Sequence, residues 1–142
     1  MEENMAEENK FHIEVISPER IFYEDDVEMI EFNTTEGEMG VLPEHVPTTV
    51  VLAPGVLRFI NGDEVKEAAV YEGFAEILKK KVTILAETAE WPEEIDVKRA
   101  EEAKIRAERR IHGSEGDINL TRAENALKRS LIRIELAQKV QR

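Results

Sequence analysis

The order of apolar and polar residues divides the chain into two parts with different periods. In the first part, Phe11, Ile13 and Val15 alternate with polar neighbours, which is the period of a half-buried strand. Further apolar or β-branched runs, bounded by Gly, Pro or Asn, cover residues 27–32, 48–52 and 56–60. Several short strands at close spacing predict a β-sandwich or flattened barrel over residues 11–91.

Two hairpins are predicted within this first part. Asn61-Gly62 stands between two apolar runs in "LRFINGDEVKEAAV", and Asn-Gly is a strong short-range indicator of a hairpin turn. The segment "GFAEILKKKVTILAET" predicts a second hairpin that turns at Lys79-Lys80, with Val82 and Ile84 on one face.

From Asp96 onward the period becomes helical. The first predicted helix ends near Gly113, and the second begins at Asn119, or at Thr121 with Glu124 closing a capping box. The predicted inner stripes are Ala100, Ala103, Ala107 and Ile111 on the first helix and Leu120, Ala123, Leu127, Ser130, Ile134 and Ala137 on the second. Because the connection is short, the helices should be antiparallel. The predicted fold class is α+β: the sandwich, then a two-helix hairpin over residues 92–142.

The predicted hairpin has a mostly alanine interface. Burying a methyl group contributes about 0.8 kcal/mol, against about 1.5–3 kcal/mol for a Leu or Ile side chain. Two isolated helices of about 16 and 20 residues are marginal in water. The hairpin should therefore depend on docking, on a partner or on a ligand, and we expect it to be a movable part.

Charge follows the same division of the chain. The net charge of the 142 residues is −12, yet residues 95–142 carry 12 Lys/Arg against 8 Asp/Glu. The strongly acidic first part argues against general nucleic-acid binding there. Residues 1–10 are acidic and polar, which predicts a disordered tail rather than a signal segment. The longest uncharged run, 46–57, is too short and too rich in proline to span a bilayer, so we expect a soluble, cytosolic protein.

The sequence favours a non-catalytic protein. It has no cysteine, and it lacks a phosphate-binding G-x-x-x-x-G-K-[ST] loop, a G-x-S-x-G elbow and an H-E-x-x-H metal motif. Its histidines, His12, His45 and His112, have no metal-ligand spacing with one another. We therefore expect no catalytic residues and no metal ligands.

The start of the first helix carries an unusual charge. Asp96 is a good N-cap, and Ile95 and Ala100 occupy the two positions of a hydrophobic staple. The basic pair Lys98-Arg99 follows in the first turn, where the helix dipole favours acidic residues. A cap that served stability alone would not place a guanidinium there.

Four arginines form a possible anion site on the hairpin. Arg99 and Arg106 share a helix face and lie about 10 Å apart along its axis, and Arg129 and Arg133 share a face at i, i+4. An antiparallel hairpin brings the pairs together beside a helix N-terminus, which would suit a polyphosphate. The alternative interpretation is that these arginines are solvated and paired with Glu102 and neighbouring acids.

The chain resembles a known family from Phe11 to its C-terminus. The loop "EGEMGVLPEHVP" has the family's pattern E-G-E-[LM]-G-[IV]-x-P-x-H-x-P, "GVLRF", "GFAEI" and "VTILAETAE" match its later strands, and "EIDVKRAEEAKIRAE" and "NLTRAENALKRSLIRI" match its two helices. The family is the epsilon subunit of bacterial F-type ATP synthases.

This resemblance implies a ten-stranded sandwich and a mobile hairpin in a non-catalytic rotor subunit. It implies a peripheral location at the cytoplasmic face of the bacterial plasma membrane, where the subunit couples proton translocation to ATP synthesis. The loop of Glu38 would approach the c-ring, and the loop of His45 would approach the gamma subunit. The extended hairpin would reach the catalytic alpha and beta subunits and restrain ATP hydrolysis.

The resemblance also implies ATP as a regulatory ligand, with no required cofactor. The segment "IDVKRA" is similar to the [IL]-D-x-x-R-A motif of members that bind ATP on the folded hairpin. The implied contact residues are Glu90, Ile95, Asp96, Arg99, Ala100, Arg106, Arg129 and Arg133. Two other functions stay open: a free-standing ATP-sensing domain, and a purely structural coupling subunit whose arginines grip acidic partner surfaces.

Overall fold

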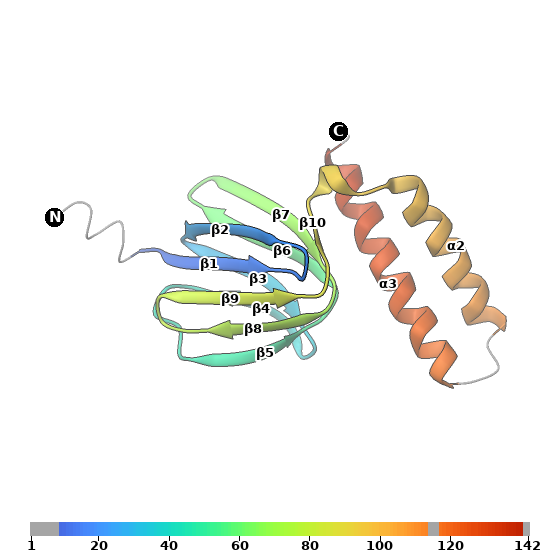
Figure 1. Cartoon of the computed structure of the whole chain (residues 1–142), viewed down its shortest axis with the longest axis horizontal. Coiled ribbons are helices and arrows are strands. Elements are labelled where there is room, and N and C mark those ends of the chain that lie inside the picture. The colour runs from blue at the N-terminus through green and yellow to red at the C-terminus, as the bar shows by residue number, and fades with distance from the viewer. Residues whose placement is uncertain (1–8, 114–116, 141–142) are drawn as a thin grey trace. The chain divides into compact units, whose positions relative to one another are not determined.

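The computed structural model describes residues 9–113 and 117–140. It divides into two compact units, Met1–Ala89 and Glu90–Arg142 (Figure 1). Residues 1–8 of the predicted acidic tail lie outside the described residues.

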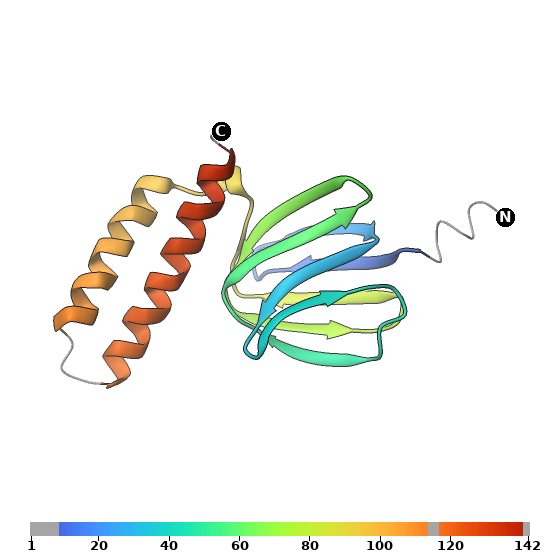
Figure 2. The same ribbon diagram turned by 180° about the vertical axis from the view of Figure 1, so that it is seen from behind.

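The first unit is built from strands that curl into a near-closed β-sandwich. The described residues form β1 (Phe11–Ile16), β2 (Ile21–Val27), β3 (Met29–Thr34), β4 (Gly37–Val41), β5 (Thr48–Leu52), β6 (Gly55–Asn61), β7 (Glu64–Val70), β8 (Gly73–Ile77), β9 (Lys81–Ala86) and β10 (Ala89–Glu90). Their order in the sheet is β10-β7-β6-β3-β5-β8-β9-β1-β2, and β4 pairs with β3 outside this path. The predicted sandwich is confirmed (Figure 2).

Strand β1 lies between β9 and β2, next to one end of this order. It pairs antiparallel with β2 and parallel with β9, its only parallel neighbour among the described strands. Its side chains alternate between buried and half-buried, as the sequence predicts. Ile13 and Val15 are fully buried in the core, as are Val82 and Ile84 on β9.

Both predicted hairpins are present. β6 and β7 pair up to Asn61 and Glu64, and Gly62 in the turn has a φ of 57°, a left-handed conformation that favours glycine. The other hairpin turns at Lys79-Lys80, where Leu78 N–H donates to the Lys81 carbonyl at 2.8 Å.

The predicted strand at residues 27–32 is wrong in its extent. Val27 ends β2, and β3 begins at Met29. The break lies at Glu28, because its N–H leaves the strand pattern and faces the Ile60 carbonyl at 3.0 Å and Asn61 Oδ1 at 3.1 Å.

The second unit contains a short 3₁₀ helix and two long helices. They are η1 (Pro92–Glu94), α2 (Val97–Gly113) and α3 (Asp117–Val140). The predicted end of the first long helix at Gly113 is confirmed. The predicted start of the second, at Asn119 or Thr121, is wrong, because α3 already begins at Asp117. Thr121 therefore lies inside α3 and is not its cap.

The long helices are antiparallel and lie side by side (Figures 1 and 2). Residues equally far from the connection between them lie at about the same level, which places Ala100 beside Ser130 and Ala107 beside Ala123. All four are at most 2% exposed, so the predicted small-residue interface is confirmed. Leu136, which the predicted stripe omits, is also buried. In the described part of the chain no helix is long and apolar enough to cross a membrane.

Candidate functional site

The N-terminus of α2 has the predicted cap and the predicted charge conflict. Asp96 Oδ1 accepts a hydrogen bond from the Arg99 backbone N–H at 3.1 Å, which confirms the N-cap. Ile95 and Ala100 are buried, whereas the side chain of Arg99 is exposed. The first turn of α2 has no acidic residue. Its positive dipole end therefore carries Lys98 and Arg99 with Asp96 as the adjoining carboxylate.

Arg133 is held by Glu90 within the second unit. Its Nε lies 2.8 Å and its Nη2 lies 2.7 Å from the same oxygen, Glu90 Oε1. The side chains are 29% and 21% exposed, so solvent screens this ion pair only partly. A charge-assisted contact of this kind fixes the guanidinium and neutralises one positive charge of the hairpin.

The antiparallel packing gathers three of the four arginines at one level. Arg99 on α2 is as far from the connection as position 131 on α3. It therefore lies midway between the levels of Arg129 and Arg133, about 3 Å along the axis from each. Arg129 and Arg133 are half-buried. Arg106 is exposed and lies about 10 Å nearer the connection. The arrangement can therefore concentrate positive charge around Arg99, with Arg106 at its edge.

The alternative interpretation paired these arginines with Glu102, and for Arg99 and Arg106 the structure does not show that pairing. Within residues 9–113 and 117–140, no ion pair joins Glu102 to Arg99 or Arg106, and an ion pair on α2 joins Lys104 to Glu108 at 3.8 Å. Arg99 and Arg106 are directed to solvent and available to an anion.

In the sandwich, Glu38 lies on the edge strand β4. It is exposed and pairs across the ladder with Asn33 on β3. Beside it is a polar hollow of about 140 Å³, lined by Glu31, Phe32, Asn33, Glu38, Met39, Gly40, Val56 and Arg58. The Arg58 Nε in this hollow is bound by Glu67 Oε2 at 3.0 Å. The face around Glu38 is therefore acidic and accessible.

His45 lies in the loop 42–47, which presents apolar side chains to solvent. The loop is fixed by Glu44, whose φ is 66° and whose N–H donates to the Lys79 carbonyl at 2.8 Å. Leu42 is 57% exposed and Val46 is 72% exposed. His45 is half-buried, and its Nδ1 contacts the Val46 carbonyl at 2.7 Å. This loop therefore presents two apolar side chains to solvent, which a protein partner could cover.

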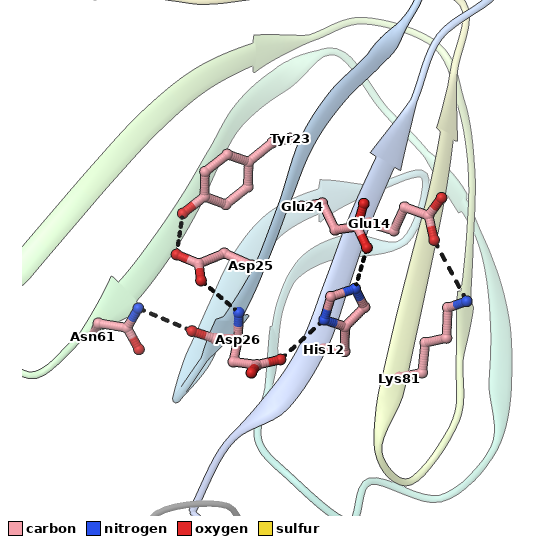
Figure 3. Close-up of polar contacts among 8 residues, drawn as sticks. All are labelled: His12, Glu14, Tyr23, Glu24, Asp25, Asp26, Asn61 and Lys81. Atoms are coloured by element: carbon pink, nitrogen blue, oxygen red, sulfur yellow. Dashed lines mark hydrogen bonds and ion pairs between the residues drawn. The ribbon is translucent and has the colours of Figure 1, made fainter.

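A polar cluster on β1 and β2 was missed by reasoning from the sequence (Figure 3). His12 Nδ1 lies 2.9 Å from Asp26 Oδ1, and His12 Nε2 lies 2.9 Å from Glu24 Oε1. The hydrogen bond to Asp26 raises the pKa of His12, and the bond to Glu24 adds to the increase. Alternation alone puts His12 on the outward face of β1, but the acidic run of β2 hides its strand character, so the pairing that completes the cluster was not predictable.

Beside this cluster, Tyr23 and Asp25 on β2 form a hydrogen-bonded pair. Tyr23 Oη donates to Asp25 Oδ2 at 3.0 Å, and burial raises the pKa of Tyr23 to about 12. The pKa of Asp25 is lowered by the backbone N–H of Asp26 and by Tyr23. The Tyr23 ring packs on Phe59 at a centroid distance of 4.4 Å. The contact between Tyr23 on β2 and Phe59 on β6 anchors β2 to the sandwich.

Family models match both units of the chain. The model described as "ATP synthase, Delta/Epsilon chain, beta-sandwich domain" matches residues 10–92, and "ATP synthase, Delta/Epsilon chain, long alpha-helix domain" matches residues 93–138. The chain belongs to the ATP synthase delta/epsilon chain family.

Curated relatives support the same family. The ATP synthase epsilon chain of Caldanaerobacter subterraneus subsp. tengcongensis is 46% identical over 132 residues, which are 92% of this chain and 96% of the relative. The epsilon chain of Halalkalibacterium halodurans is 43% identical over 127 residues, 89% of this chain and 96% of the relative.

Solved structures of ATP synthases share the fold. A chain of the Euglena gracilis mitochondrial ATP synthase, from a structure of OSCP, F1 and c-ring, is 27% identical, with a TM-score of 0.78 over 92% of this chain and 82% of its own length. A chain of the Tetrahymena thermophila central stalk and c-ring is 18% identical with a TM-score of 0.53 over 94% and 97%, a likeness of fold alone. The resemblance to epsilon subunits is thus confirmed for family and fold.

The ion pair between Glu90 and Arg133 should stabilise the hairpin measurably. We expect Glu90→Gln and Arg133→Gln each to lower its free energy of unfolding, and a double-mutant cycle to give a coupling energy of about 1 kcal/mol that falls at high salt. Trp91, the only tryptophan, reports urea unfolding of this unit by fluorescence. Arg122→Gln, at an exposed position of α3, is the matched control and should change little. Zero coupling at low salt would contradict the predicted role of the pair.

Proposed function

We propose that the chain is a non-catalytic rotor subunit that couples proton translocation to ATP synthesis from the cytoplasmic face of a bacterial plasma membrane. Membership of the family supports this role, as does the likeness to a chain from a structure of OSCP, F1 and c-ring. The observation that carries the proposal is the exposed loop 42–47, because burying Leu42 and Val46 against a partner subunit would be favourable.

The two candidate contact regions of the sandwich have different chemistry. Loop 42–47 carries Leu42, His45 and Val46 and would bind the gamma subunit mainly by apolar burial. The face around Glu38 is acidic and lies on an edge strand, so it would bind polar or basic groups of the c-ring. The division suits a subunit placed between two rotor partners.

The hairpin would regulate hydrolysis by changing its conformation. Its small-residue interface buries little apolar surface per residue, so the folded hairpin is only weakly stabilised by itself. The extended form would reach the alpha and beta subunits and restrain ATP hydrolysis. Such a two-state element can be shifted by a few kcal/mol of ligand binding.

ATP would be the ligand that favours the folded hairpin. Arg99, Arg129 and Arg133 lie near the same level of the hairpin, Glu90 holds Arg133, and phosphate groups would supply negative charge beside Arg99. Asp96, Ile95 and Ala100 hold the first turn of α2 in place, and Arg106 extends the positive surface. If free ATP were about 1,000 times its dissociation constant, binding would stabilise the folded form by about 4 kcal/mol.

Gamma binding should depend on Val46. We expect Val46→Asp to raise the dissociation constant for the purified gamma subunit at least tenfold, or about 1.4 kcal/mol, because a carboxylate would be buried in an apolar contact. Calorimetry or co-elution on a sizing column measures the effect. Val65→Asp, at a 51% exposed position of β7, is the control and should bind normally. Equal loss in both variants would refute the assignment to loop 42–47.

Removal of the hairpin should release hydrolysis. We expect deletion of residues 92–142 to raise ATPase activity at low ATP in the assembled enzyme, since the inhibitory element is gone. Subunit content is checked by gel electrophoresis, so that loss of assembly is recognised. Unchanged activity in a complete complex would show that the hairpin does not inhibit.

ATP binding should require Arg99. We expect Arg99→Ala and Arg129→Ala each to weaken binding to the full chain by about 1.5–3 kcal/mol in calorimetry, the range for hydrogen bonds to charged groups. ADP, with one phosphate fewer, should bind more weakly than ATP. Arg109→Ala, at an exposed position of α2, is the control. If wild type binds no ATP at millimolar concentration, the arginines serve a structural coupling subunit.

A further inference from the structure

The His12 ring is held from both sides on the outward face of β1. Its Nδ1 lies 2.9 Å from Asp26 Oδ1, and its Nε2 lies 2.9 Å from Glu24 Oε1 (Figure 3). A neutral imidazole has one N–H donor and one acceptor nitrogen, whereas the protonated ring has two donors. In the neutral form, one ring lone pair would face a carboxylate oxygen at hydrogen-bond distance. The geometry is therefore that of an imidazolium that donates to both carboxylates.

The charged side chains near this ring come from β1, from the residue before it and from both strands that pair with β1. They are Glu14 and Lys10, Glu24 and Asp26 on β2, and Lys81 on β9. Lys81 stands directly opposite His12 in the ladder, but its ammonium lies 3.4 Å from Glu14 Oε2. Lys81 therefore compensates Glu14, and the His12 imidazolium supplies the positive charge that both carboxylates of β2 contact.

Strand β2 depends on β1 for its place in the sheet. It is the last strand in the sheet order, with β1 as its neighbour. Glu14 and Glu24 stand opposite each other in this pair, and like charges in that position weaken a strand pair. Loss of the ring proton would remove one hydrogen-bond donor and one positive charge from between these strands. The pairing of β2 with β1 is therefore stronger when His12 is protonated.

We propose that the protonated His12 ring holds β2 to β1, and that its deprotonation at rising pH loosens this strand pair locally. The inner faces of the two strands stay buried through Val15 and Val27, and the Tyr23 ring stays packed on Phe59, so the sandwich remains folded. The result is a pH-sensitive contact at one end of the sheet. It does not depend on the proposed rotor and nucleotide functions.

The direction of the pH effect follows from the environment of the ring. The hydrogen bond to Asp26 raises the pKa of His12 above its ordinary value of 6.5, burial of the ring lowers it in part, and the bond to Glu24 raises it further. The ring therefore binds its proton more tightly when the strands are paired. Its contribution to pairing is complete below pH 6.5 and is lost as the pH rises through the raised pKa.

An NMR titration of the His12 ring in the full chain tests the protonation state. We expect His12 to titrate above pH 6.5 in wild type, and Asp26→Asn to lower its midpoint, because this carboxylate raises the pKa most. Glu24→Gln should lower the midpoint less. His45 and His112, the other two histidines of the chain, are internal references and should keep their midpoints in both variants. A wild-type midpoint at or below pH 6.5 for His12 would overturn the proposal.

Amide hydrogen exchange measures the loosening of the strand pair. After correction for the intrinsic exchange rate, we expect the protection of β2 amides to fall between about pH 6 and about pH 9 in wild type. The fall should be tenfold for each full pH unit between the paired and the open pKa of His12. The β6–β7 pair is the internal control and should keep its protection.

His12→Gln separates the ring proton from the rest of the strand pair. Glutamine keeps a side-chain N–H donor but does not titrate in this range, so the protection of its β2 amides should not depend on pH. Its amide spectrum shows whether the variant is folded, and Asp26→Asn gives a second test through a smaller pH dependence. Equal pH dependence in wild type and folded His12→Gln would overturn the proposal, as would a wild-type protection of β2 that does not change with pH.

Discussion

The contact between α2 and α3 is the constraint on which the behaviour of the second unit depends. Ala100 meets the level of Ser130, and Ala107 meets that of Ala123, so the helices can approach closely while burying little apolar surface. Larger side chains would bury more apolar surface and stabilise the hairpin more strongly. With small ones, burial contributes less to the folded hairpin, so in the proposed function the charged groups at the edge of the interface would matter more.

The charged residues at the edge of the hairpin interface include Lys98 and Arg99, which stand in the first turn of α2, where acidic residues are usually preferred. Lys98 and Arg99 stand at the positive end of the α2 dipole, where they oppose helix formation. Asp96 offsets this in part by capping the first turn, and Glu90 offsets the charge of Arg133. Lys98 and Arg99 do not add to the stability of this helix start, and in the proposed function they would favour a polyphosphate anion beside the folded hairpin.

Features set by neighbours in sequence were predictable, and features set by distant pairing were not. The alternation of β1, the turn at Lys79-Lys80 and the Asp96 cap each depend on a few adjacent residues. The parallel pairing of β1 with β9 joins residues about 70 positions apart, and the contacts of His12 require the register of β2. The start of α3 was placed too late because Thr121 and Glu124 also fit a capping box, and tertiary context overrides such local preferences.

Each unit places charges of one sign near one another, as carboxylates on β1 and β2 and as arginines on the hairpin, and the two backbones compensate them differently. On β1 and β2 the ladder fixes Glu14 opposite Glu24, and neighbouring side chains relieve the repulsion: Lys81 Nζ lies 3.4 Å from Glu14 Oε2, and His12 Nε2 lies 2.9 Å from Glu24 Oε1. In the hairpin, Arg99 and Arg129 are on separate helices, and in the proposed function a bound anion would add negative charge between the two helices. Fixed side chains therefore compensate the carboxylates of the sandwich, whereas in the proposed function a bound anion would compensate the arginines of the hairpin.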